Sequence, residues 1–128
     1  MEFTSYSKKE QALSVFMQIE KAIEQLQEWN SNIHSANDYY LSPGGMQTLA
    51  ASCMLIEAIG EGVNKIHRIT EKQLLPKRDD IPWEDIIGLR NHIAHGYFDI
   101  DGDIVFSVVK EDLVSLLEAV RFFINELS

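Results

Sequence analysis

Apolar residues recur along most of the chain at steps of three and four, the spacing of one face of an α-helix. In a first predicted helix, from about Lys8 to Ile33, this stripe lies opposite a face of glutamates. Similar stripes predict a second helix from about Gly45 to Leu74, a short third from about Trp83 to His95, and a last from about Lys110 to Leu127. The pattern predicts an all-α protein: an antiparallel up-and-down bundle of about four main helices, forming one domain over residues 1–128.

Glycine and proline residues mark the expected breaks between these helices. Pro43 and the glycine pair after it separate the first two helices, Pro82 suits the entry to the third, and Gly96 suits its end. Gly60 and Gly62 interrupt the second helix, where each costs about 1 kcal/mol relative to alanine. We expect them to permit the close approach of a neighbouring helix; the alternative is a weakness that the helix tolerates.

Three aspartates, Asp99, Asp101 and Asp103, follow the third helix in "DIDGDIVF" and resemble part of a calcium-binding loop. Glu111 lies one residue short of the position at which such a loop places its bidentate glutamate. We therefore expect a solvated turn in this segment, with no calcium site.

Charge limits the partners that the chain can have. Its net charge of −9 argues against a protein that coats nucleic acid by bulk electrostatics, and no DNA partner is expected. Five of the eleven basic residues nevertheless gather shortly before the third helix: Lys65, Arg68, Lys72, Lys77 and Arg78. Such a run is more often a solvated helix face. If the chain binds RNA, we expect the contact to be local and centred on these residues.

The single cysteine, Cys53, cannot form an intrachain disulfide, which fits a reducing cytoplasm. It lies in an apolar run and is expected in the core. The longest mostly apolar stretch is too short to span a bilayer, and the first residues lack the pattern of a secretion signal. We expect a cytoplasmic protein without a membrane segment.

Polar and aromatic residues crowd into the segment "RNHIAHGYFDID", residues 90–101. On a helix, Arg90 falls on the stripe of Trp83, Ile86 and Ile93, at a position where leucine would suit the core. Burying an arginine is costly unless an anion or several acceptors meet its guanidinium. Arg90 is therefore expected either to extend out of the bundle or to face a groove that receives a negative ligand.

His95 supplies a second group suited to reaction at a phosphate. It lies about 140° around an ideal helix from Arg90, so the two meet only if the arginine bends, the helix end unwinds at Gly96, or a second chain contributes. Asn91 lies four residues before His95 and shares its helical face. In RNA cleavage, such a histidine takes the proton of a ribose 2′-hydroxyl while the arginine stabilises the transition state.

Spacing alone leaves other interpretations open. Structural roles are more common than catalysis, with Arg90 forming a salt bridge and His95 capping the helix. A zinc site is weaker still, because His92 and His95 have no third ligand identifiable from sequence, and His34 and His67 cannot be placed. We expect no metal and no cofactor.

The segment "RNHIAHGY" resembles the R-x-x-x-x-H-x-Y motif of HepT-like proteins, a branch of the HEPN superfamily, with Arg90, His95 and Tyr97 at the three motif positions. "EAIGEGVNKI" is similar to the second-helix segment of this family, and "IPWEDIIGLRNHIAHGYFDID" to its approach to and exit from the motif. The resemblance covers roughly residues 18–127. Asn91 stands where the family often has a polar residue, whereas His92 is not part of the motif.

This resemblance implies a helical-bundle homodimer that acts as a metal-independent endoribonuclease, the toxin half of a toxin–antitoxin pair. The partner would be a small nucleotidyltransferase (MntA-like) antitoxin that transfers AMP to the motif tyrosine, here Tyr97. The dimer would bring two motifs into one cleft, which supplies the second chain that the angular offset requires. The alternative is a non-catalytic module that keeps the motif to hold a nucleotide or its partner. An intact set of Arg90, His95 and Tyr97 favours the enzyme.

Overall fold

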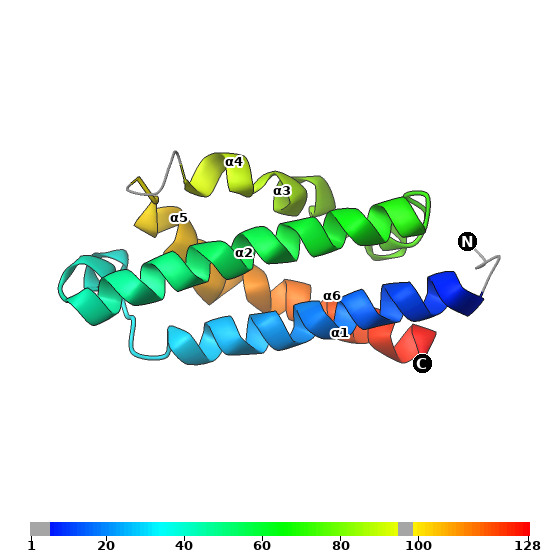
Figure 1. Ribbon diagram of the computed structural model, residues 1–128, viewed down its shortest axis with the longest axis horizontal. Helices are drawn as coiled ribbons and strands as arrows, with labels where there is room; N and C mark the ends of the chain where they lie inside the picture. The colour runs from blue at the N-terminus through cyan, green and yellow to red at the C-terminus, as the bar shows by residue number, and fades with distance from the viewer. Residues whose placement is uncertain (1–5, 95–98) are drawn as a thin grey trace.

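The long helix α2 (Pro43–Ile69) lies in the middle of the molecule, with helices α1, α3, α4 and α5 packed against it (Figure 1). The structure is a computed structural model that describes residues 6–94 and 99–128. The remaining elements are helix α1 (Tyr6–Trp29), the 3-10 helices η1 (Ala36–Tyr40) and η2 (Leu75–Arg78), the short helices α3 (Trp83–Gly88), α4 (Arg90–Ile93) and α5 (Gly102–Ser107), the π-helical segment η3 (Val108–Asp112), and α6 (Leu113–Leu127).

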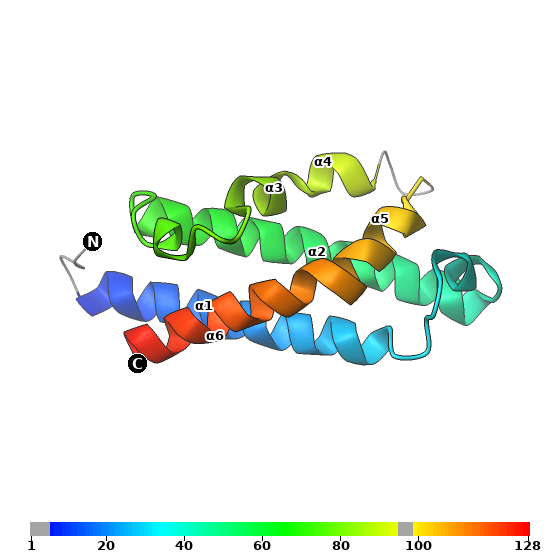
Figure 2. The same ribbon diagram turned by 180° about the vertical axis from the view of Figure 1, so that it is seen from behind.

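The chain reverses direction four segments in a row: α1, α2, the short helices α3 and α4 together, and the run from α5 to α6 (Figure 1). Helices α1 and α2 lie side by side and antiparallel, α6 packs against α1, and α3 and α4 lie along α2 (Figures 1 and 2). Within the described residues there is no strand, only an isolated bridge between Ala94 and Ile100. The prediction of an all-α, antiparallel bundle is confirmed. None of the described helices is long and apolar enough to cross a membrane.

Phe123 of α6 joins three helices in the core. Its ring stacks on Phe16 of α1, with 5.1 Å between centroids, and lies 6.2 Å from the ring of Trp83 in α3. All three side chains are buried. A helix of six residues such as α3 is not stable by its own hydrogen bonds. These core contacts therefore hold α3, and with it the start of the motif segment, against the bundle.

A buried polar network joins the end of α1 to its neighbours. Asn30 Nδ2 donates to Ser52 Oγ in α2 at 2.9 Å, and the Tyr39 hydroxyl in η1 donates to Asn30 Oδ1 at 2.6 Å. Lys110 Nζ in η3 donates to the Asn30 carbonyl oxygen at 2.8 Å. Burial raises the pKa of Tyr39 to about 12, so its hydroxyl stays a donor at any physiological pH. The network fixes how these four segments meet.

The first two helices end earlier in the sequence than predicted. Helix α1 ends four residues before Ile33, where the Asn30 side chain donates to the Leu26 carbonyl at 2.9 Å and the chain turns. Helix α2 ends five residues before Leu74, and the chain leaves it through Glu71 and Lys72, which have φ values of 54° and 61°. Both Ile33 and Leu74 are buried, so the apolar pattern continues past the helix ends.

The third and last predicted helices also differ from the structure. The motif segment forms α3 and α4, which ends at Ile93; Ala94 is extended, so the prediction that this helix reaches His95 was wrong. The solvated turn predicted around Asp99, Asp101 and Asp103 was right about exposure, since all three are exposed, but wrong about the turn, because Gly102–Ser107 form helix α5. The Asp101 side chain accepts from the backbone N–H groups of Asp103 and Ile104, at 3.0 and 3.1 Å, and caps α5. The final helical run therefore begins at α5, well before Lys110.

Gly60 confirms the expectation of close helix approach. A Cβ atom built on it would lie 2.9 Å from the Ile86 carbonyl oxygen, in the backbone of α3. At Gly62 the nearest atoms are side-chain atoms of α1, with Ile19 Cδ1 at 3.1 Å. Glycine at position 60 thus lets the backbone of α3 lie directly on α2.

Candidate functional site

Arg90 is the first residue of α4, and its side chain is 69% exposed. Its Nη1 atom lies 3.8 Å from Glu61 Oε1 on α2. Exposed ion pairs of this kind contribute little to stability. Of the two expected positions for Arg90, the structure shows the side chain extending out of the core while it also borders a groove. Its guanidinium remains accessible to an anionic ligand.

Buried neighbours on both sides position Arg90. Trp83 and Ile86 anchor α3, and Ile93 anchors the end of α4. The chain keeps a helical conformation through Leu89, but the backbone N–H groups of Leu89 and His92 bond three residues back instead of four. This tightened turn departs from ideal α-helical geometry, and Arg90 emerges at the surface although its neighbours on the predicted stripe are buried.

A groove with a volume of about 610 Å³ lies between α2 and the motif segment. We call it the Arg90 groove; among the described residues it is lined by Ala50, Ala51, Cys53, Met54, Glu57, Arg90, Ala94 and Ile100. The Cys53 thiol donates to Glu57 Oε1 at 3.9 Å. Burial, together with the nearby Glu57 charge, raises the pKa of Cys53, so it stays a thiol. The groove has apolar walls, one cation and one carboxylate.

The other motif residues are distributed as follows. Asn91 and His92 are exposed on α4. His95 and Tyr97 lie outside the residues that the structure describes. The residues that flank this segment are held together by backbone contacts. Ala94 forms an antiparallel bridge with Ile100, and the Asp101 backbone N–H donates to the Ile93 carbonyl oxygen at 2.8 Å. The helix ends at Ile93, so neither the 140° offset nor the shared face of Asn91 and His95 follows from helical geometry.

Basic residues continue from Arg90 along α2. Lys65 and Arg68 are exposed, and they share a helical face with Glu61, because steps of four and three residues return to nearly the same angle. Lys72 and Lys77 are exposed in the connection that follows α2. A line of cations therefore runs from Arg90 toward the C-terminal end of α2.

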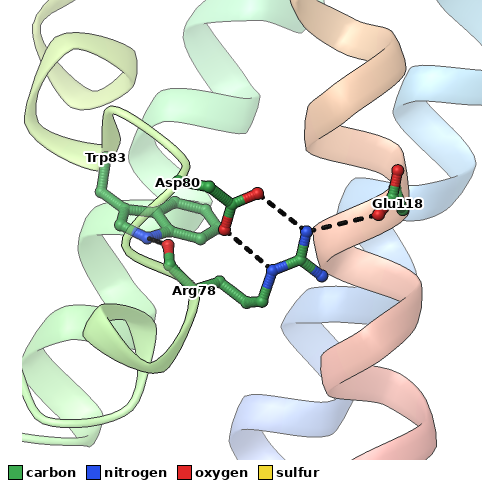
Figure 3. Close-up of polar contacts among 4 residues, drawn as sticks. All are labelled: Arg78, Asp80, Trp83 and Glu118. Carbon is green, nitrogen blue, oxygen red and sulfur yellow. Dashed lines mark hydrogen bonds and ion pairs between the residues drawn. The ribbon is translucent and has the colours of Figure 1, made fainter.

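Arg78, the remaining member of the basic cluster, is engaged within the protein (Figure 3). Its Nε and Nη2 atoms donate to the two Asp80 carboxylate oxygens, each at 2.9 Å, and Nη2 lies 3.5 Å from Glu118 Oε1. The guanidinium also sits 5.2 Å from the centre of the Phe122 ring, while Trp83 Nε1 donates to the Arg78 carbonyl at 2.9 Å. The hydrogen bonds from Arg78 lower the pKa of Asp80. Arg78 thus ties the loop before α3 to α6.

The two histidines that the sequence left unplaced occupy different environments. His67 is buried near the end of α2; its Nε2 atom lies 3.6 Å from Glu84 Oε1, and its buried Nδ1 has no hydrogen-bond partner among the described residues. Burial lowers the pKa of His67. The His34 side chain is exposed, and the His34 backbone N–H donates to Asp38 Oδ2 at 2.8 Å. In residues 6–94 and 99–128, no three His, Cys, Asp or Glu side chains are grouped to hold a metal ion.

The sequence analysis did not select Glu57 or Glu61 as site residues. They lie one helical turn apart on α2, 33 and 29 residues before Arg90, and only the fold brings them near it. Their four-residue spacing is the one sequence signal that they share a surface.

Comparison with known proteins assigns the family. Residues 19–123 match the family described as ribonuclease HepT-like, and the chain belongs to this family. A 66-residue stretch, 52% of this chain, is 34% identical to a protein of Methanocaldococcus jannaschii described as a candidate RNase, covering 57% of it. A stretch of 70 residues, 55% of this chain, is 34% identical to a protein of Thermococcus cleftensis described as a probable ribonuclease HepT, covering 60% of it.

A third relative, described as a candidate RNase of Caldanaerobacter subterraneus, is 27% identical over 66 residues, which are 52% of this chain and 55% of the relative. The matched region therefore spans less than two thirds of each of these relatives. No solved structure gives a significant match. The family match and the resemblance drawn from the motif agree on HepT-like proteins.

Proposed function

We propose that this protein is a metal-independent endoribonuclease, a cytoplasmic toxin of a toxin–antitoxin pair. Arg90 and His95 would carry the reaction, with Asn91 binding a phosphate oxygen or orienting His95. Membership of a family described as ribonuclease HepT-like supports this proposal, because an intact Arg, His and Tyr set lies within the matched residues. The exposed Arg90 guanidinium carries the structural argument, since no core contact stops it from reaching a phosphate.

The reaction would proceed by attack of a ribose 2′-hydroxyl on the adjacent phosphorus. His95 takes the hydroxyl proton, and the bond to the 5′-oxygen of the next nucleotide breaks. That oxygen leaves as a hydroxyl by taking a proton from solvent, and a 2′,3′-cyclic phosphate remains. Arg90 stabilises the extra negative charge on the phosphate oxygens in the transition state. Lys65 and Arg68 would guide the RNA backbone along α2, with Lys72 and Lys77 beyond them; Arg78 is the weakest of these candidates, because it already pairs with Asp80 and Glu118.

The protein would act as a homodimer with its two motifs in one cleft. Leu41, two residues before α2, and Met46, in its first turn, are 70% and 48% exposed and offer apolar surface for a second copy. Met46 lies one turn before Ala50, which lines the Arg90 groove, so a dimer formed here would face that groove. Light scattering should then give a dimer at tens of micromolar, and a monomer at that concentration would contradict the composite site.

The cleavage proposal is tested by comparing two neighbouring histidines. We expect His95→Ala to abolish RNA cleavage and His92→Ala to retain most of it, because only His95 occupies the motif position. Cleavage should continue in EDTA and leave 2′,3′-cyclic phosphate ends, which mass spectrometry identifies. Equal loss in both variants, or a reaction that EDTA stops and zinc restores, would contradict the assignment.

Tyr97 would be the regulatory position, at which an MntA-like nucleotidyltransferase attaches AMP. The added phosphate and base would compete with RNA for Arg90. We expect Tyr97→Phe to fold, to cleave RNA, and to remain toxic when the cognate transferase is co-expressed. A transferase that neutralises this variant as fully as the parent, with no added AMP mass on either, would point instead to inhibition by simple binding.

A further inference from the structure

The Arg90 groove has features that phosphate chemistry alone does not use. Its volume of about 610 Å³ falls in the usual range for small-molecule sites, about 300–1,000 Å³. Its walls are apolar, with a cation at Arg90 and a carboxylate at Glu57. A bare phosphate would need the cation but neither the apolar walls nor the carboxylate. These features suit a ligand that joins an anion to a flat, mostly apolar ring with polar edges, as a nucleotide does.

We propose that the Arg90 groove is a nucleobase subsite selective for guanine, which holds a base next to the phosphate bound by Arg90. This inference rests on the proposed ribonuclease function. The base would lie between Ala50 and Met54 on α2 and Ala94 and Ile100 of the motif segment. Methionine sulfur makes favourable contacts with aromatic rings, and aliphatic side chains cover the faces of the ring without selecting one base.

Glu57 selects guanine by the donors on its Watson–Crick edge. An ionised carboxylate only accepts hydrogen bonds and offers two oxygens side by side. Guanine alone presents two adjacent N–H donors, N1–H and N2–H. Adenine and cytosine present a donor beside an acceptor, and uracil one N–H between two carbonyls. With those bases a lone pair would face the carboxylate, and hydrogen bonds would be lost in a partly desolvated groove.

Neighbouring groups prepare Glu57 and Arg90 for these separate roles. The Cys53 thiol donates to Glu57 Oε1 from the buried side of α2 and limits how the carboxylate can rotate. Arg90 pairs with Glu61, one turn beyond Glu57 and outside the described lining of the groove. An RNA phosphate would replace this exposed Glu61 contact at little cost, because such pairs are weak. Glu57 then remains free for the base.

Binding of two mononucleotides tests the subsite without requiring cleavage. We expect guanosine 3′-monophosphate to bind about ten- to a hundredfold more tightly than adenosine 3′-monophosphate in calorimetric titration of the full chain, as for other bidentate base contacts. Glu57→Gln should remove most of this preference, since an amide offers one acceptor and one donor. Glu61→Gln is the matched control: the same charge is lost on the same helix face, and the preference should remain.

Equal binding of the two nucleotides, no measurable binding of either, or a guanine preference that survives Glu57→Gln would overturn the subsite. Thermal melting of each variant establishes that it is folded. Mapping cleavage ends on an RNA that contains every dinucleotide step separates this inference from the proposed function. Cleavage without base preference would support the ribonuclease function and contradict the guanine subsite. Guanine binding through Glu57 in a chain that cleaves no RNA would support the subsite and contradict the ribonuclease function.

Discussion

Replacing Gly60 with alanine should loosen the contact on which the motif segment rests. The added methyl group would lie 2.9 Å from the Ile86 carbonyl oxygen, a non-bonded distance shorter than Cβ atoms show in real proteins. The obstructing atom belongs to the backbone of α3, and α3 is held in place by the buried Trp83 and Ile86 side chains. The methyl group therefore has no flexible neighbour to displace, and α3 must shift as a unit.

Two opposing contributions set the size of the effect. Alanine is favoured over glycine in a helix interior by about 1 kcal/mol. Overpacking a well-packed site costs about 1–3 kcal/mol, and a backbone contact belongs at the upper end of that range. We expect Gly60→Ala to lower the free energy of unfolding by about 1–2 kcal/mol, which lowers Tm by roughly 3–10 °C in a domain of this size. Displacement of Arg90 with α3 should also reduce RNA cleavage.

Gly62→Ala is the control, because it adds the same methyl group to the same helix. Its neighbours are the ends of flexible side chains, with Ile19 Cδ1 at 3.1 Å, so the gain in helix propensity should prevail. Thermal melts followed by circular dichroism, with cleavage rates for both variants, make the comparison. A Gly60→Ala variant as stable as Gly62→Ala and equally active would refute the reasoning that glycine is needed for the approach of α3.

Two further expectations concern charge. Burial holds the pKa of His67 in the folded protein below its value in the unfolded chain. As pH falls below about 6.5, His67 becomes protonated in the unfolded state but stays neutral in the folded state. The free energy of unfolding therefore falls until the pH reaches the lower pKa of the folded protein. Tm measured between pH 7.5 and 5.5 should therefore decline less in His67→Gln than in the parent, and parallel curves would contradict the burial argument. Replacing Lys65 and Arg68 by alanine should reduce the slope of log affinity against log salt for single-stranded RNA by about 0.7 per lost phosphate contact. Lys21→Ala on α1 should leave that slope unchanged, and an equal effect of both changes would argue for nonspecific attraction.

Hydrophobic periodicity predicted the helical class and most of the core but not where helices end. Ile33 and Leu74 continue the apolar spacing although both lie beyond a helix end, because buried turns need apolar residues as much as helices do. Glu71 and Lys72 adopt left-handed conformations that usually indicate glycine, so no residue type marked the end of α2. Asp101 was interpreted as part of a solvated turn, although aspartate is equally suited to cap a helix.

The site was predictable only where its residues are close in sequence. Arg90, His95 and Tyr97 stand within one short segment, and their spacing gave the family resemblance that residues 19–123 bear out. Glu57 and Glu61 approach Arg90 only because Gly60 allows α3 to lie on α2, a tertiary contact that periodicity does not encode. The exposure of Arg90 likewise depends on the tightened turn at Leu89, where an ideal helix predicted a core position.

The π-helical segment η3 makes this region tolerant of a change in chain length. A π turn holds one residue more than an α turn, so η3 amounts to a one-residue insertion that the helix has absorbed. Deleting one residue here would let α5 and α6 join as a regular helix, with both segments near their present register. Deleting Lys110 would also remove its hydrogen bond to the Asn30 carbonyl oxygen. Relatives that are shorter by one residue should therefore carry the gap within η3.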